Sequence, residues 1–101
     1  MNIIVSHIPL QRPLTPEEVA LITRDLPPMV SDVTGCHGFY CAQLSGAELV
    51  SISVWDSAID ADTATAWLDP WLKTALGPAM AGPPDRRAYE VLVAREPGER
   101  R

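Results

Sequence analysis

The segment 48–55, ELVSISVW, is the feature that most restricts how this chain can fold. Successive side chains of a β-strand point to opposite faces of the sheet. One face of this strand is wholly apolar, and the other mixes two serines with a leucine and a tryptophan. The first face holds Val50, Ile52 and Val54, and the second holds Leu49, Ser51, Ser53 and Trp55. Neither face suits water, so we expect the sheet to be covered on both sides.

Three further segments have the composition of strands. Residues 2–8 are β-rich and end at prolines, and residues 88–96 form an apolar run near the end of the chain. Residues 38–44 precede the strand at 48–55, and the short link SGA between them is typical of an antiparallel hairpin.

The first helical segment begins with a clear capping pattern. Thr15 can cap the helix, Pro16 suits its first turn, and Glu18 completes a capping box. The pair at 27–28, both prolines, predicts a helix broken into two pieces, with Gly35 available to end the second.

A second helix follows the hairpin. Ser57 can cap it, and Gly77 and Pro78 can end it. Asp69 followed by Pro70 has the form of a new helix start, so we expect this helix to be broken too.

The order strand, helix, strand, strand, helix, strand predicts an α+β, ferredoxin-like βαββαβ fold. Its four-stranded antiparallel sheet would carry both helices on one face. At 101 residues we expect a single domain over residues 1–96 and a disordered polar tail at 97–101. The bare sheet face with Val50, Ile52 and Val54 would then pack against a second copy, so we predict a homodimer.

Charge and hydropathy exclude several partners. The net charge is −5, and the basic pairs in DRR (85–87) and in the tail are expected to be solvated surface, so we expect no nucleic-acid partner. No run is long enough to span a membrane, and the first ten residues lack the features of a secretory signal. We therefore expect a cytoplasmic protein, with Cys36 and Cys41 as reduced thiols.

The face that holds Ser51, Ser53 and Trp55 predicts a pocket, because small serines beneath helices leave volume unfilled. The alternative is that the serines hydrogen-bond locally and Trp55 is simply core. Of the two tryptophans on the second helix, we expect Trp67 to reach the cavity rim and Trp71 to pack in the core between helix and sheet.

Two titratable residues are candidates for proton transfer. His7 lies near the end of the first strand and could accept a phenolic proton if it faced the pocket, although its direction cannot be read from the sequence. Tyr40 alternates with its neighbours, so either Tyr40 or the pair Phe39 and Cys41 faces the helices. The alternative role for Tyr40 is in a core or a dimer interface.

The stretch GFYCAQLSGAELVSISVWDS, a helix, and then AGPPDRRAYEVLV together resemble the antibiotic biosynthesis monooxygenase family of dimeric α/β barrels over residues 2–95. The resemblance implies a homodimer with one pocket per subunit. In the aromatic-polyketide members it also implies an oxygenase that turns an anthrone-like phenol into a quinone with molecular oxygen, using neither metal nor flavin.

Carried over by position, Trp55 matches the tryptophan that stabilises the reacting complex in those members. Ser51 stands at the position of their asparagine, and Ala61 at that of their relay tyrosine. The haem-degrading branch of the superfamily needs an axial histidine on the second helix, and residues 57–76 contain none. We therefore expect no cofactor and no metal.

Two functions follow as hypotheses. The first is a cofactor-independent monooxygenase of secondary metabolism that oxidises a polycyclic aromatic. The second is a related dimer without oxygenase activity that binds a hydrophobic metabolite or assists a biosynthetic partner enzyme. The predicted catalytic residues are His7 and Trp55, and the predicted substrate-binding residues are Tyr40, Ser51, Ser53 and Trp67.

Overall fold

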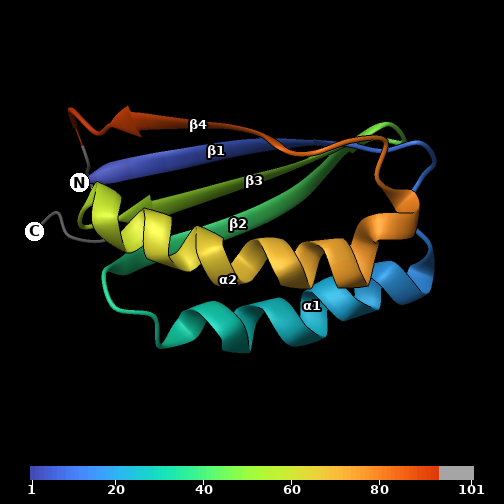
Figure 1. The fold of residues 1–101 in the computed structure, drawn as a ribbon, viewed down its shortest axis with the longest axis horizontal. Helices are drawn as coiled ribbons and strands as arrows, with labels where there is room; N and C mark the ends of the chain where they lie inside the picture. The colour runs from blue at the N-terminus through green and yellow to red at the C-terminus, as the bar shows by residue number, and fades with distance from the viewer. Residues whose placement is uncertain (94–101) are drawn as a thin grey trace, which may run out of the picture.

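The computed structural model describes residues 1–93, and the chain forms a four-stranded antiparallel sheet with two helices on one side (Figure 1). The strand order is β2-β3-β1-β4. The elements in chain order are β1 (Asn2–Pro9), α1 (Pro16–Ser31), β2 (Cys36–Ser45), β3 (Glu48–Trp55), α2 (Ala58–Leu76), the short 3₁₀ helix η1 (Gly77–Ala79) and β4 (Asp85–Glu90). The predicted ferredoxin-like order is confirmed.

The last strand begins earlier than the sequence predicts. It spans Asp85–Glu90 rather than 88–96, because its extent is fixed by its partner β1, whose first residue, Asn2, pairs with Glu90. Residues 91–93 follow outside the strand. The remainder of the predicted strand and the predicted tail at 97–101 lie outside the described residues.

Both helices are continuous, and the predicted breaks are wrong. Pro27 and Pro28 lie inside α1, and Pro70 lies inside α2. All three prolines are exposed, and the carbonyl groups four residues before them belong to exposed residues. Water can therefore replace the backbone hydrogen bonds that these prolines cannot donate. After α1, Gly35 adopts a φ of 81°, which favours glycine, and the chain turns into β2.

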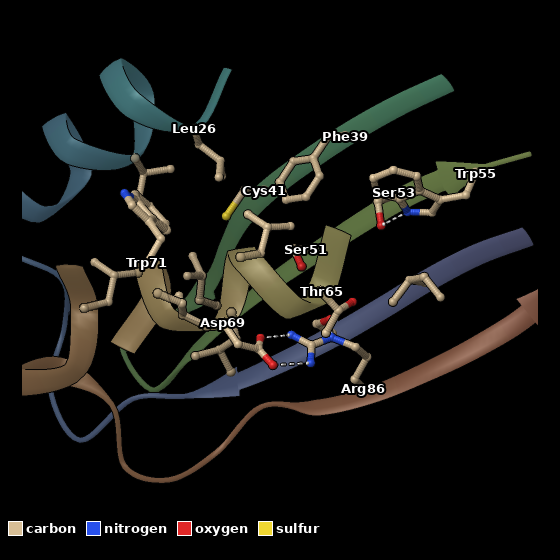
Figure 2. A pocket seen from close by; sticks show the side chains of 18 residues that line it. Leu26, Phe39, Cys41, Ser51, Ser53, Trp55, Thr65, Asp69, Trp71 and Arg86 are labelled. Carbon is tan, nitrogen blue, oxygen red and sulfur yellow. Dashed lines mark hydrogen bonds and ion pairs between the residues drawn. The ribbon is translucent and has the colours of Figure 1, made fainter. Parts of the chain in front are cut away.

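The buried core is divided into two clusters. One lies towards η1 and contains Ile8, Leu10, Leu49, Leu76 and Ala79. The other contains Trp55, Ala61 and Ala64. Residues of both clusters line one cavity between the sheet and the helices (Figure 2). The two helices and the sheet therefore enclose a hollow rather than a continuous core.

The other face of the sheet is mostly apolar, with His7, Asp85 and Arg87 as charged or polar residues on β1 and β4, and no element of residues 1–93 packs over it. Strand pairing aligns Tyr40, Ile52 and Val5 across this face, and next to them Val54, Ile3 and Tyr89. Tyr40 is 67% exposed and Tyr89 is 50% exposed. We call this surface the open face.

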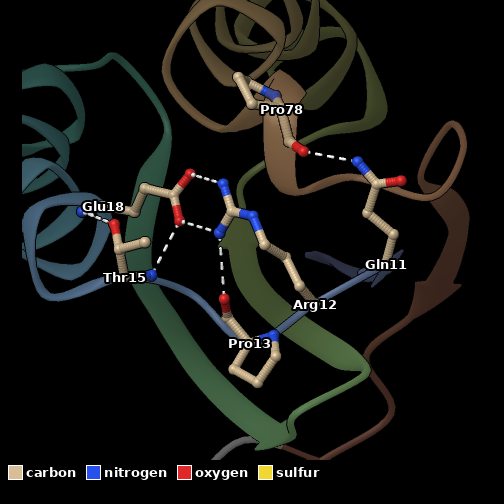
Figure 3. A network of polar contacts seen from close by, with 6 residues as sticks. All are labelled: Gln11, Arg12, Pro13, Thr15, Glu18 and Pro78. Atoms are coloured by element: carbon tan, nitrogen blue, oxygen red, sulfur yellow. Dashed lines mark hydrogen bonds and ion pairs between the residues drawn. The ribbon is translucent and has the colours of Figure 1, made fainter.

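The N-terminus of α1 carries the predicted capping box. The Thr15 hydroxyl accepts a hydrogen bond from the Glu18 backbone N–H at 3.2 Å, and the Glu18 carboxylate accepts one from the Thr15 N–H at 2.8 Å (Figure 3). Arg12 donates to both carboxylate oxygens of Glu18, at 2.8 and 3.0 Å. Close by, the Gln11 side chain donates to the Pro78 carbonyl, which joins the segment between β1 and α1 to η1.

These bonds shift the titration of Glu18. Hydrogen bonds from Arg12 and then from the Thr15 N–H lower the pKa of the carboxyl from 4.5 to about 2. A carboxyl whose pKa is lowered by folding stabilises the fold above its unfolded pKa. That contribution is lost as the pH falls from about 4.5 towards 2.

We predict that Glu18→Gln lowers the free energy of unfolding by about 1 to 2 kcal/mol at pH 7, because it removes the charged half of the capping box. The deficit should shrink as the pH falls below 4.5 and vanish near pH 2. Urea unfolding of the wild type and of Glu18→Gln over this pH range measures the difference in unfolding free energy. Glu17→Gln, in the same first turn, is the control. An equal loss in both variants, or a deficit independent of pH, would contradict this account of Glu18.

Candidate functional site

The cavity lies between the helix-facing side of the sheet and both helices. The centres of water-sized molecules can occupy about 50 Å³ of it. All four strands contribute wall residues, and so do α1 and α2. A hollow of this kind, apolar with a few polar groups, is the usual form of a small-molecule site.

Aromatic and aliphatic side chains form most of the wall. Phe39 comes from β2, Leu26 from α1, and Trp71 from α2 (Figure 2). Trp55, at the end of β3, is 1% exposed and also borders the cavity. These residues offer a flat ligand apolar surfaces from both the sheet and the helices.

The serines and Trp55 of β3 lie on the helix side, as the strand alternation predicts. Ser51 and Ser53 both border the cavity. The Trp55 indole N–H donates to the Ser53 hydroxyl at 2.8 Å, in a buried position. Trp55 and Ser53 therefore bond to each other while they form the wall, which combines the two alternatives left by the sequence.

His7 and Tyr40 lie on the open face and do not reach this cavity. His7 pairs with Val50 across the strands, and its Nδ1 lies 2.8 Å from Glu48 Oε2. Tyr40 pairs with Ile52, so its neighbours Phe39 and Cys41 face the helices instead. The expectation that His7 or Tyr40 lines this cavity is wrong, because strand alternation points both side chains to the open face.

The two helix tryptophans exchange their expected places. Trp67 packs against the buried cluster around Trp55 and is not among the wall residues. Trp71 lines the cavity. The reason is the continuity of α2, because an unbroken helix carries the cavity-facing stripe onward through Leu68 and Leu72.

The polar side of the cavity was missed by the sequence reasoning. Arg86 of β4 donates from Nη2 and Nη1 to the two carboxylate oxygens of Asp69 on α2, at 2.8 and 3.2 Å. Its Nε donates to the Ser6 hydroxyl of β1 at 3.1 Å. The expectation that the DRR segment is solvated surface is wrong for Arg86, whereas Arg87 is exposed, next to Asp85.

The sequence would have predicted the cavity-facing position of Arg86 if the last strand had been expected to begin at Asp85. In a strand that begins at Asp85, alternation places Arg86 on the opposite face from its two charged neighbours. Pairing with β1 then sets it beside Ser6, which is 3% exposed on the helix side.

Cys41 is the remaining titratable group in the wall, and burial raises the pKa of its thiol. A raised pKa keeps the thiol protonated and weakly nucleophilic. Within residues 1–93, no three His, Cys, Asp or Glu residues are grouped so that they could hold a metal ion. No helix in the same range is long and apolar enough to cross a membrane.

Comparison with solved structures identifies the fold. A monooxygenase from the gene ActVA-Orf6 of Streptomyces coelicolor, solved with nanaomycin D, superposes with a TM-score of 0.70 at 23% identity, over 95% of this chain and 91% of that one. The chain has the antibiotic biosynthesis monooxygenase fold. SnoaB, a cofactor-independent oxygenase from Streptomyces nogalater, has a TM-score of 0.67 at 14% identity, over 92% of this chain and 94% of that one.

The same fold also occurs in a Nitrosomonas europaea protein of unknown function, NE2512, with a TM-score of 0.75 at 11% identity, over 95% of this chain and 93% of that one. No protein-family model matches the chain, and no curated protein matches it in sequence. At these identities the antibiotic biosynthesis monooxygenase likeness establishes the fold, and the chemistry has to be argued from the cavity.

Proposed function

We propose that this protein is a cofactor-independent monooxygenase that oxidises a polycyclic aromatic, of the anthrone-like phenol class, to a quinone. The observation that supports it most is the cavity, which has aromatic walls and a short polar edge in a fold shared with two named oxygenases. Trp55, Ser51 and Ser53 serve as substrate-binding wall residues in this proposal, with Trp55 beside the reacting ring.

The reaction needs no electron carrier from the protein, because the substrate itself is the reductant. Oxidation of an anthrone-like methylene to a carbonyl releases four electrons, and one molecule of oxygen accepts them. One oxygen atom enters the new carbonyl group, and the other leaves as water together with the two methylene hydrogens. The protein has to ionise the phenol, orient it and limit the access of water.

A second function, binding of a hydrophobic metabolite without oxidation, is favoured by one observation. Ala61 stands where the resemblance expects a relay tyrosine, and it is 2% exposed in the cluster around Trp55. The position therefore supplies no hydroxyl. If no other group ionises the ligand, the protein would act as a binding protein or as an aid to a partner enzyme.

We further propose that the protein is a homodimer that pairs through the open face. The open face bears Ile52 and Val54 together with Tyr40 and Tyr89, both of which are at least half exposed. Such an apolar sheet surface is costly to leave in water. A second copy offers the same surface, so an isologous contact would cover both. The proposed dimer would operate in the cytoplasm, as the sequence predicts.

Oxygen uptake with 1,8-dihydroxyanthrone tests the oxygenase proposal. We expect uptake faster than the spontaneous reaction, with one oxygen molecule consumed per quinone formed. Leu26→Trp should abolish the enhancement by filling the cavity, whereas Val19→Trp, on the exposed side of the same helix, should leave it unchanged. Uptake at the spontaneous rate, with the quinone product still bound by the protein, would reject the oxygenase in favour of the binding protein.

Sedimentation at micromolar concentration tests the dimer. Ile52→Asp should convert the dimer to monomers, because a buried unpaired carboxylate costs several kcal/mol. Thr63→Asp, on an exposed part of α2, should leave the dimer intact. A monomeric wild-type protein would disprove this interface.

A further inference from the structure

The polar edge of the cavity is a single connected group. Arg86, Asp69 and Ser6 come from β4, α2 and β1, and the ion pair joins the edge strand to the helix across the cavity wall (Figure 2). The Arg86 side chain is 28% exposed and that of Asp69 is 45% exposed. Both are therefore within reach of a ligand in the cavity and of water at its mouth.

The pair has hydrogen-bonding capacity to spare. A guanidinium has five N–H donors, and residues 1–93 accept three of those of Arg86, one at Ser6 and two at Asp69. Each carboxylate oxygen of Asp69 accepts one of these bonds and can accept another. The edge thus offers a donor and an acceptor side by side, which is the pattern that a hydroxyl group requires.

We propose that the Asp69–Arg86 pair recognises a phenolic hydroxyl of the bound aromatic and ionises it. This inference rests on the proposed function and names the group that ionises the substrate. The phenolic O–H bond breaks, its proton passes to a carboxylate oxygen of Asp69, and its electron pair stays on the phenolate oxygen. The N–H groups of Arg86 then hold the phenolate. Molecular oxygen accepts the four electrons that the oxidation of the methylene releases.

Charge pairing explains why this site can hold a phenolate. Before the transfer, the cation of Arg86 is paired with the anion of Asp69. After it, Asp69 is neutral and Arg86 is paired with the phenolate, so the net charge in the cavity does not change. The net charge falls by one only when the proton leaves Asp69 for water at the mouth of the cavity.

Few other charges act on this pair. Cys41 of β2 is the other titratable residue in the described cavity wall, and α1 contributes only Ile22 and Leu26 to it. Lys73 lies one turn beyond Asp69 and lines a neighbouring groove with it, outside the cavity. The ionisation of a bound phenol should therefore respond chiefly to Asp69 and Arg86.

The test is the pKa of bound 2-naphthol, read from its absorbance during a pH titration, in the absence of any oxidation. Asp69→Asn leaves Arg86 as an unpaired cation and should lower this pKa by about one pH unit relative to the wild type. Arg86→Gln leaves Asp69 as an unpaired anion and should raise it. Arg87→Gln, the same charge change on an exposed neighbour, should leave it unchanged.

Opposite shifts in the two variants support the proposal by placing the phenolic hydroxyl beside the pair, because an ion pair remote from the bound phenol would shift its pKa in neither variant. The effect of Asp69→Asn on turnover then tests whether Asp69 takes the proton. Where Arg86→Gln does not fold, Asp69→Asn decides alone, since it keeps the guanidinium. A naphthol pKa that is unchanged or raised in Asp69→Asn overturns the proposal. So does binding of 2-methoxynaphthalene, which has no proton to give, as tightly as 2-naphthol in the wild type.

Turnover separates this inference from the proposed function. If the wild type oxidises 1,8-dihydroxyanthrone, Asp69→Asn should lower kcat by at least about tenfold with little change in KM, as expected for loss of a general base. If the pKa of bound 2-naphthol shifts in opposite directions in the two variants but the wild type takes up no oxygen, the pair still binds the hydroxyl group and the oxygenase proposal is rejected. Oxygen uptake that Asp69→Asn does not slow would reject Asp69 as the base and leave the oxygenase intact.

Discussion

The register of β1 with its two neighbours is the constraint on which the site depends. It sets Ser6 beside Ser51 on one side and beside Arg86 on the other, all three on the helix face. The next residue, His7, is set with Val50 and Asp85 on the open face. A slip of one residue would exchange these two sets, so the register determines which groups can meet a ligand.

The divided core follows from the same arrangement. Serines at positions 6, 51 and 53 are too small to fill the space beneath the helices, and the two apolar clusters close only its ends. An unfilled hollow costs stability relative to a packed core. The Asp69–Arg86 pair and the Trp55–Ser53 bond satisfy polar groups around it, and no buried side-chain polar atom in the described residues lacks a partner. A fold that keeps such a hollow is suited to binding.

Local patterns predicted much of this arrangement. The capping box of Thr15 and Glu18, the hairpin and the helix-facing side of β3 depend on neighbours in the chain, so the sequence is sufficient for them. The direction of His7 and the start of β4 depend on pairing between distant strands. The continuity of the helices through their prolines depends on which side of each helix is solvated. Arg86 is the clearest case, because its partners lie 17 and 80 residues away in the chain.

The most direct test of this account is where a flat phenol binds. Nuclear Overhauser contacts between 2-naphthol and the isotope-labelled protein would locate it. The account predicts contacts from the naphthol ring to Leu26, Phe39 and Leu72 in the cavity wall. Contacts to Val5, Ile52 and Tyr89 of the open face, with none to the cavity wall, would contradict it.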